Sequence, residues 1–155
     1  MGPGDRVLDV GAGDGALTRH LVAVGAKVVA VEAHPGRAQL LRDRFGDRGD
    51  VVVVRADAAD LRLPRHDFHV VANPPFAITA ALLRRLLHPA SRLVSAHLVL
   101  QQQAARKWGS PRAPDIGRWG RTFDVSLGRS VPRSAFRPPP HVPTQVLVIR
   151  RRPGR

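Results

Sequence analysis

The sequence predicts an α/β protein built on a mostly parallel sheet of seven strands, with helices on both faces. Short runs of β-branched residues alternate along the chain with stretches whose apolar residues recur at helical spacing. Most of these runs are apolar without interruption, which is typical of strands that helices cover on both sides. The 155 residues, 43% of them hydrophobic, are enough for one domain with its own core.

The predicted elements follow one another with short connections. The strands span residues 6–10, 27–32, 50–55, 67–72, 92–100, 122–127 and 145–149. The helices span residues 15–24, 35–45, 78–87 and 101–108, and Pro35 suits the first turn of the second one. Residues 109–120 form a loop rich in Gly, Pro and Arg, and a proline-rich segment, 136–143, joins the last two strands. We expect one domain over residues 1–150 and a frayed basic tail over residues 151–155.

Charge is divided unevenly between the two halves of the chain. Residues 1–75 hold ten basic and ten acidic residues, whereas residues 76–155 hold fifteen basic and two acidic ones. The second half therefore carries the whole net charge of +13, which indicates a surface that faces a polyanion such as nucleic acid. Compositional bias is the alternative, because 23 of the 25 basic residues are arginine. Bias does not explain why acidic residues become rare after residue 75.

Several classes of function are excluded or disfavoured. Cysteine is absent, which excludes disulfides, thiolate zinc sites and cysteine nucleophiles. No apolar run approaches the ~18 residues of a membrane span, and the first residues do not form a signal peptide. We therefore expect a cytoplasmic protein that makes no membrane contact. Residues 66–69 (HDFH) predict surface histidines rather than a metal site.

A glycine-rich stretch, residues 9–15 (DVGAGDG), lies between the first predicted strand and its helix. Glycines there let the backbone turn sharply and approach a ligand, and the helix N-terminus offers N–H groups. The pattern fits a dinucleotide fingerprint and also an S-adenosylmethionine loop. A tight turn without a ligand is the third interpretation.

Acidic residues follow the same edge of the predicted sheet. Glu32, the only glutamate, ends the second strand and is placed to accept hydrogen bonds from ribose hydroxyls. Asp57 follows the third strand and could accept from an adenine amino group. Solvated charges or helix caps are the alternatives. With Asp9, they form a stronger pattern, because parallel strands deliver their carboxyl ends to one edge.

The tetrapeptide Asn73-Pro74-Pro75-Phe76 closes the fourth strand. An exocyclic amine on a base is a poor nucleophile, because its lone pair is shared with the ring. A carboxamide oxygen and a backbone carbonyl can accept its two hydrogens and direct the lone pair to a methyl group, while Phe76 stacks on the base. This is catalysis by positioning. The alternative makes Asn73 a helix cap and Pro74 the first helical residue, which leaves Pro75 and Phe76 unexplained.

These motifs, in their order and spacing, resemble those of the ribosomal RNA adenine N6-methyltransferases, which include the KsgA-type dimethylases and the Erm erythromycin-resistance enzymes. Residues 101–108 resemble the family's Gln-initiated helix, and residues 136–142 resemble its F-x-P-x-P-x-V segment. The KsgA branch usually has Asn-Leu-Pro-Tyr and Lys-Val-Asp-Ser at two places where this chain has Asn-Pro-Pro-Phe and, at 141–144, His-Val-Pro-Thr. Those differences favour the Erm branch.

The resemblance implies a Rossmann-like methyltransferase fold that uses S-adenosylmethionine. It implies methyl transfer to N6 of an unpaired or loop adenine in 23S ribosomal RNA, with resistance to macrolide, lincosamide and streptogramin B antibiotics as the consequence. We expect a monomer. The expected catalytic residues are Asn73, Pro74 and Phe76. The expected cofactor-binding residues are Asp9, Gly11, Gly13, Gly15, Glu32, Asp57 and Asn73.

The RNA surface is expected in the basic second half. Its expected residues are Arg106, Lys107, Arg112, Arg118, Arg121, Arg133, Phe136 and Arg137. Family members also carry a segment with a Gln-Asn-Phe motif before the first strand and a helical RNA-binding domain after the last one. We expect this chain to lack both.

Three alternative functions remain open. A DNA adenine or protein glutamine methyltransferase could use the same Asn-Pro-Pro-aromatic turn. A catalytically idle RNA-binding module would bind RNA and transfer no methyl group. A nicotinamide oxidoreductase would leave that turn without a role.

Overall fold

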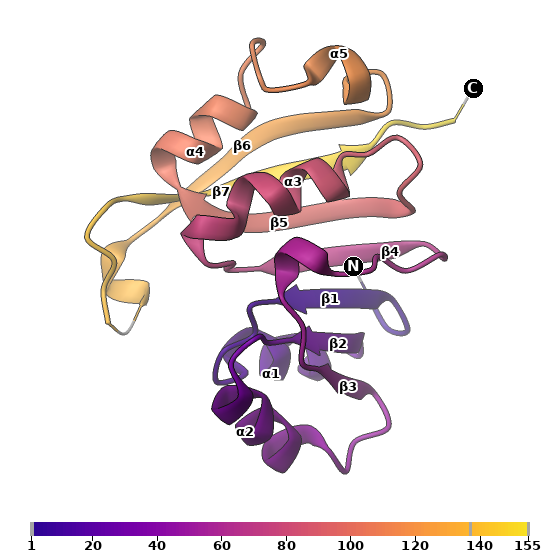
Figure 1. Cartoon of the computed structure of the whole chain (residues 1–155), viewed down its shortest axis with the longest axis vertical. Coiled ribbons are helices and arrows are strands. Elements are labelled where there is room, and N and C mark those ends of the chain that lie inside the picture. Colours follow the sequence, from indigo (N-terminus) through magenta and orange to yellow (C-terminus); the bar gives the residue numbers. More distant parts are fainter. Residues whose placement is uncertain (1, 137, 155) are drawn as a thin grey trace.

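Seven strands form the sheet at the centre of the molecule. The structure, a computed structural model, describes residues 2–136 and 138–154. The strands are β1 (Arg6–Val10), β2 (Lys27–Val31), β3 (Val51–Val54), β4 (Phe68–Ala72), β5 (Leu93–Gln101), β6 (Phe123–Val131) and β7 (Thr144–Arg151). They follow the order β3-β2-β1-β4-β5-β7-β6 across the sheet (Figure 1). Only β7 is antiparallel to its neighbours, which confirms the mostly parallel sheet.

Helices cover both faces of the sheet. They are α1 (Ala16–Ala23), α2 (Pro35–Phe45), α3 (Thr79–Leu86), α4 (Gln102–Trp108) and α5 (Ile116–Trp119), with short 3₁₀ helices η1 (Ala58–Asp60), η2 (Phe76–Ile78) and η3 (Arg133–Ala135). Leu21 of α1 and Leu41 of α2 pack on one face, over β1 to β3. Leu83 of α3 and Trp108 of α4 belong to the larger core on the other face. None of the helices in the described ranges has the length and apolar character to span a bilayer.

The strand order creates a switch point between β1 and β4. From β1 the chain adds β2 and β3 on one side, and then returns to add β4 and β5 on the other. In open α/β sheets a ligand binds at such a point, outside the carboxyl ends of the strands. The loops that follow β1 to β4 carry the glycine stretch, Glu32, Asp57 and the Asn-Pro-Pro-Phe turn. The fold therefore gathers the predicted cofactor and catalytic motifs along one edge, called the carboxyl edge below.

Two elements differ from their predicted form. β6 continues to Val131, past the predicted end at residue 127, because it pairs with β7 again after an irregularity between Leu127 and Ser130. The residues in this part of β6 do not form an apolar run, so the sequence pattern did not predict that the strand continues. The predicted loop 109–120 contains α5, whose Trp119 is buried and donates from Nε1 to the Pro114 carbonyl at 2.8 Å.

The prediction of a frayed basic tail is wrong for its first two residues. Arg151 belongs to β7, its Nε donates to the Leu93 carbonyl at 2.8 Å, and its guanidinium lies 4.7 Å from the centre of the Phe123 ring. Arg152 donates its backbone N–H to the Thr122 carbonyl and its Nε to the Gly120 carbonyl. Arginine side chains can satisfy backbone carbonyls at a sheet edge, so a basic run need not be a solvated tail.

Candidate active site

The glycine-rich stretch, residues 9–15, continues past the end of β1 as a loop that backbone hydrogen bonds hold in place; it is called the glycine loop from here on. The N–H groups of Gly11 and Ala12 both donate to the Val31 carbonyl, at 2.8 and 3.0 Å, which ties the end of β1 to the end of β2. Gly11 and Gly13 have φ angles of 72° and 59°, in the left-handed region that favours glycine. The Gly15 N–H donates to the Ala12 carbonyl. The loop's contribution is therefore a shape, since these N–H groups are already used within the protein.

Glu32 is buried and joins the glycine loop to the start of α2. Its side chain belongs to a residue only 7% exposed, and its two oxygens accept from the N–H groups of Gly13 and His34, each at 2.9 Å. The interpretation as a solvated strand-end charge is therefore wrong. Each carboxylate oxygen keeps a second acceptor position, which is what a pair of ribose hydroxyls requires. The cap of α2 is His34, whose Nδ1 accepts from the N–H groups of Gly36 and Arg37.

Asp57 lies beside Glu32 and is exposed. The Ala56 N–H donates to the Glu32 carbonyl, which fixes the chain just before Asp57. Asp57 Oδ1 accepts from the Ala59 N–H at 2.9 Å and caps η1, as the alternative interpretation expected. The cap uses one acceptor position of one oxygen. The rest of the exposed carboxylate can accept hydrogen bonds from a ligand.

The Asn-Pro-Pro-Phe turn faces solvent at the switch point. Asn73 is exposed, Pro74 is buried, and Phe76 is 40% exposed despite its size. The helix η2 begins at Phe76 with Pro75 at its N-cap, so Asn73 is no helix cap and Pro74 is no first helical residue. The turn touches the glycine loop, because a Cβ at Gly11 would lie 2.9 Å from Pro75 Cδ and 3.6 Å from the Asn73 carbonyl oxygen.

Asp9 lies beneath the glycine loop rather than in the open crevice. It is 1% exposed, and its Oδ2 accepts from the Thr18 hydroxyl at 2.7 Å. Burial raises the pKa of the Asp9 carboxyl to about 6, and the charge of Glu32 adds to the rise, while the bonds to Thr18 oppose it. Asp9 Oδ1 has no hydrogen-bond partner among the described residues. This position supports the loop from below through α1 and gives no direct path to a ligand.

Two residues of the site, Thr18 and His34, were not predicted from the sequence. Thr18 is fully buried in α1, and a threonine within a helix does not by itself indicate a role in a site. Its role depends on its hydrogen bond to Asp9, which the sequence does not reveal. His34 precedes a helix-starting proline, and that position was a usable signal for a cap. No cluster of three His, Cys, Asp or Glu side chains suited to a metal occurs within residues 2–136 and 138–154. His69, one of the predicted surface histidines, instead lies half-buried on the sheet with Nδ1 2.7 Å from Ser95 Oγ.

Some of the predicted RNA-binding residues lie near the carboxyl edge. Arg106 and Lys107 are exposed on the last turn of α4, the helix that follows β5. Arg133 and Phe136 lie between β6 and β7, whose residues Val131 and Thr144 pair where β5 ends. The Gln102 N–H donates to the Pro143 carbonyl and fastens this loop to α4. Arg137 lies outside the described residues.

Other predicted RNA-binding residues lie far from that edge. Arg121 stands just before β6, whose first residue pairs with Arg151 near the start of β5. The nine residues of β5 span about 27 Å, so Arg121 and Phe76 cannot contact one nucleotide. Arg118, on α5, lies 3.1 Å from the imidazole of His88 near the end of α3, and Arg112 is exposed between α4 and α5.

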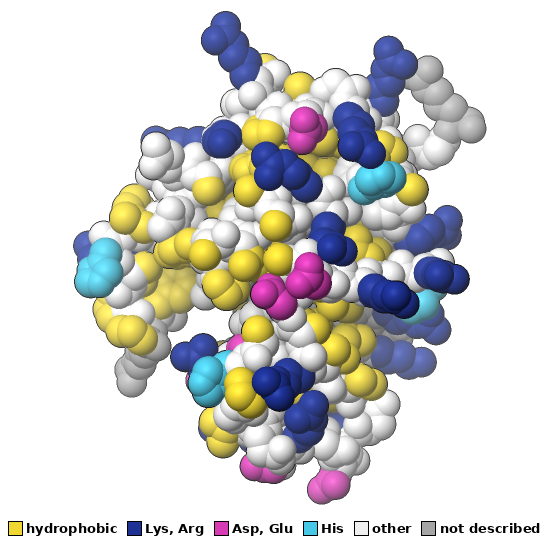
Figure 2. Space-filling model, in the orientation of Figure 1, with side chains coloured by type: hydrophobic (Ala, Val, Ile, Leu, Met, Phe, Trp, Pro, Cys, Tyr) yellow, Lys and Arg dark blue, Asp and Glu magenta, His cyan; other side chains and the backbone are white. Residues whose placement is uncertain are grey.

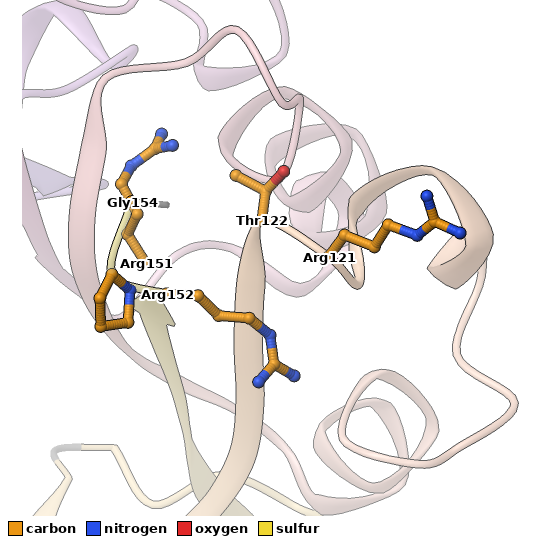
Figure 3. Close-up of a pocket in the computed structure, with 6 residues that line it drawn as sticks. Arg121, Thr122, Arg151, Arg152 and Gly154 are labelled. Carbon is orange, nitrogen blue, oxygen red and sulfur yellow. The ribbon is translucent and has the colours of Figure 1, made fainter.

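The edge of the sheet opposite the carboxyl edge, where β5 begins, is basic, but the arginines named there do not form a single phosphate-binding site. Figure 2 shows Lys and Arg side chains gathered along the right-hand side of the molecule, where β5 begins in Figure 1. Arg121, Arg151 and Arg152 border one open pocket there (Figure 3). Their side chains point in different directions and do not converge on one position (Figure 3). This edge therefore offers diffuse positive charge.

Known proteins are similar in sequence to this chain along nearly its whole length. The sequence profile named "Ribosomal RNA adenine dimethylase" matches residues 1–155. The chain is 37% identical over 147 residues to an rRNA adenine N-6-methyltransferase of Corynebacterium diphtheriae, covering 94% of this chain and 57% of that protein. It is 39% identical over 150 residues to the mycinamicin-resistance protein MyrB of Micromonospora griseorubida, covering 94% and 47%. The chain thus spans about half the length of these relatives.

Relatives of the small-subunit type are also similar. A probable ribosomal RNA small subunit methyltransferase A of Methanosarcina barkeri is 34% identical over 158 residues, which cover 99% of this chain and 54% of that protein. Among solved structures, the 23S rRNA methyltransferase ErmE superimposes with a TM-score of 0.83 at 31% identity, covering 98% of this chain and 63% of that one. The chain belongs to the ribosomal RNA adenine dimethylase family.

Proposed function

We propose that this chain transfers a methyl group from S-adenosylmethionine to the N6 amino group of an unpaired adenine in 23S ribosomal RNA. One observation carries the proposal: the exposed Asn73 and Phe76 stand on a turn that touches the glycine loop at the switch point of the sheet. A base on this turn is next to a cofactor on that loop. The relative from Corynebacterium diphtheriae, which is named an rRNA adenine N-6-methyltransferase, supports the reaction type.

The residues at the carboxyl edge fit S-adenosylmethionine better than a dinucleotide. Glu32 and Asp57 have free acceptor positions for ribose hydroxyls and for the adenine amino group. The Gly13 N–H, which a pyrophosphate would need, already donates to Glu32. A phosphate at that position would meet the negative charge of the carboxylate. S-adenosylmethionine has no phosphate, and it supplies a methyl group on a positively charged sulfur.

The catalytic turn acts by position. The Asn73 carboxamide oxygen and a carbonyl of the turn accept the two amino hydrogens of adenine, which directs the nitrogen lone pair away from the ring and toward the methyl group. Phe76 stacks on the base and fixes its plane. The prolines keep the turn rigid, with Pro74 buried beneath it. A base paired within a helix cannot reach the turn without leaving the stack, so an unpaired or loop adenine is the preferred substrate.

The choice of 23S RNA rests on the Erm branch. The Asn-Pro-Pro-Phe turn favours that branch, and the solved structure of ErmE, itself named a 23S rRNA methyltransferase, is among the similar ones. MyrB is named for resistance to mycinamicin. Resistance to macrolide, lincosamide and streptogramin B antibiotics is then the biological result. Ribosomal RNA as substrate would place the reaction in the cytoplasm, with the chain acting as a monomer.

The test measures transfer of labelled methyl groups from S-adenosylmethionine to 23S RNA, 16S RNA, duplex DNA and a release-factor protein. We expect label in 23S RNA with the parent chain and none with Asn73→Ala. Label in 16S RNA alone would assign the chain to the small-subunit branch. Label in DNA or protein would replace the substrate class. RNA binding with normal salt dependence but without label would leave an idle RNA-binding module.

A further inference from the structure

The three glycines of the glycine loop face three different surroundings. A Cβ at Gly15 would lie 2.6 Å from the Phe45 ring of α2, so that glycine allows two helices to pack. A Cβ at Gly13 would have only the Gly11 carbonyl oxygen within 4 Å, at 3.9 Å, so its side-chain direction is open. A Cβ at Gly11 would lie 2.9 Å from Pro75 Cδ and 3.5 Å from Pro74 Cα. Gly11 alone of the three faces the catalytic turn.

We infer that Gly11 is a positioning residue that sets how closely the catalytic turn approaches the cofactor loop. The inference rests on the proposed function, because it concerns the distance between the adenine amine and the methyl group. Its physical basis is that Cδ is part of a ring closed on the Pro75 backbone nitrogen, so it cannot rotate away as the end of a flexible side chain would. Any atom added at Gly11 therefore moves backbone.

The size of the displacement follows from the contact distance. Ordinary contact with a Cβ begins at 3.4 Å, so a methyl group at Gly11 pushes the Pro75 ring back by about 0.5 Å. The Asn73 carbonyl oxygen lies 3.6 Å from the same point and belongs to the same rigid turn. A misplacement of about 1 Å can lower a rate by about 100-fold, so about 0.5 Å corresponds to roughly tenfold.

Backbone strain must be separated from this effect, and Gly13 provides the matched control. Both glycines have a positive φ, 72° for Gly11 and 59° for Gly13, so an alanine at either position strains the backbone. Only the alanine at Gly11 meets the turn. A second control is Pro75→Ala, which removes Cδ, the atom in closest contact.

The experiment compares the parent with Gly11→Ala, Gly13→Ala, Pro75→Ala and the Gly11→Ala/Pro75→Ala double variant. The quantity is kcat for methyl transfer to RNA at saturating S-adenosylmethionine, with the KM for the cofactor measured separately. We expect Gly11→Ala to lower kcat about tenfold more than Gly13→Ala does, and Gly13→Ala to act mainly on KM. Pro75→Ala lowers kcat in the parent, but in the Gly11→Ala background it raises kcat by about threefold to tenfold.

Two results would overturn the inference. One is an equal loss of kcat in the two glycine variants, which would reduce the effect to backbone strain. The other is a double variant whose kcat is the product of the two single effects. If the parent transfers no methyl group, the proposed function fails, and the urea-unfolding equilibrium constants of the parent, Gly11→Ala, Pro75→Ala and the double variant decide on the contact. Coupling of about threefold or more between the substitutions keeps the contact, and independent effects reject it.

Discussion

The buried carboxyl group of Asp9 gives a stability prediction that depends on pH. Burial raises its pKa in the folded chain from 3.8 to about 6, so the folded state holds this proton more tightly than the unfolded state does. Below about pH 3.8 the group is protonated in both states and its effect is absent. Between about pH 3.8 and about 6 the unfolded chain has released this proton while the folded chain still holds it, so stability falls across this range and levels off once the folded chain carries the buried charge as well. A shift of about two pKa units corresponds to a loss of about 3 kcal/mol.

The substitution Asp9→Asn tests this reasoning, because asparagine stays neutral and its carbonyl oxygen can still accept from Thr18. The assay is urea unfolding of parent and variant between about pH 3 and about pH 8, and the quantity is the difference in their free energies of unfolding. We expect this difference to shift by about 3 kcal/mol in favour of the variant as pH rises. A constant offset, such as that from a buried unpaired amide N–H, does not affect the shift.

The exposed carboxylate of Asp60 provides the control. Asp60→Asn removes one carboxylate from the surface and leaves the buried Asp9 in place, so only the Asp9→Asn variant should show the change of about 3 kcal/mol. If the free energies of unfolding of Asp9→Asn and of the parent change in parallel with pH, the folded protein does not carry a desolvated Asp9 carboxylate. The unpartnered Oδ1 atom would then be hydrated in solution, and Asp9 could not be described as a buried support of the loop.

Four further predictions concern binding and catalysis. Glu32→Ala should weaken S-adenosylhomocysteine binding by about 1–3 kcal/mol in calorimetry, since two ribose hydroxyls and the N–H groups of Gly13 and His34 lose their acceptor; equal affinity would remove Glu32 from the site. Asn73→Ala should abolish label transfer while calorimetry still detects the cofactor, and retained turnover would refute its role. Phe76→Ala should weaken the binding of an adenine-containing RNA loop by about 1–3 kcal/mol, compared with the same RNA lacking that base. Arg106→Ala and Lys107→Ala should each flatten the slope of log affinity against log salt by about 0.7 to 0.9, and an unchanged slope would place the phosphate contacts elsewhere.

The strands of the sheet and its mostly parallel character followed from local sequence patterns, whereas the order of the strands across the sheet is known from the structure alone. Buried parallel strands are apolar runs, and this signal is present for β1 to β5 without knowledge of the fold. It fails where pairing rather than side-chain burial makes the strand. The second half of β6, from Gly128 to Val131, contains one apolar side chain and pairs with β7 at Ser130 and Val131, so no apolar pattern could reveal it.

The site was predictable to the extent that parallel strands share an edge. Glu32 and Asp57 come together because β2 and β3 are neighbours, and sequence spacing was enough to expect this. The contact between Gly11 and Pro75 could not be predicted from the sequence, because it depends on tertiary distances of a few ångströms. The same holds for Thr18, whose role exists only through the buried Asp9.

Arginines show most clearly why composition cannot assign roles. Arg106 and Arg151 contribute equally to the net charge of the second half, yet Arg106 is exposed on α4 and Arg151 donates to backbone carbonyls at the edge of the sheet. Deleting the last residues as a test of RNA binding would therefore remove the end of β7 together with its charge. Single substitutions at exposed positions are the sounder test.

The distribution of charge suggests how one domain could handle a cationic cofactor and a polyanionic substrate together. Asp9, Glu32 and Asp57 lie within or beneath the carboxyl edge, where carboxylates favour a sulfonium ion and repel phosphate. Under the proposed function, the phosphates of the RNA are held outside this region, by the basic second half of the chain. Under the proposed function, only an uncharged base would reach Phe76, with its backbone kept away from Glu32. An adenine that leaves its stack meets this requirement, because flipping separates the base from its own phosphates.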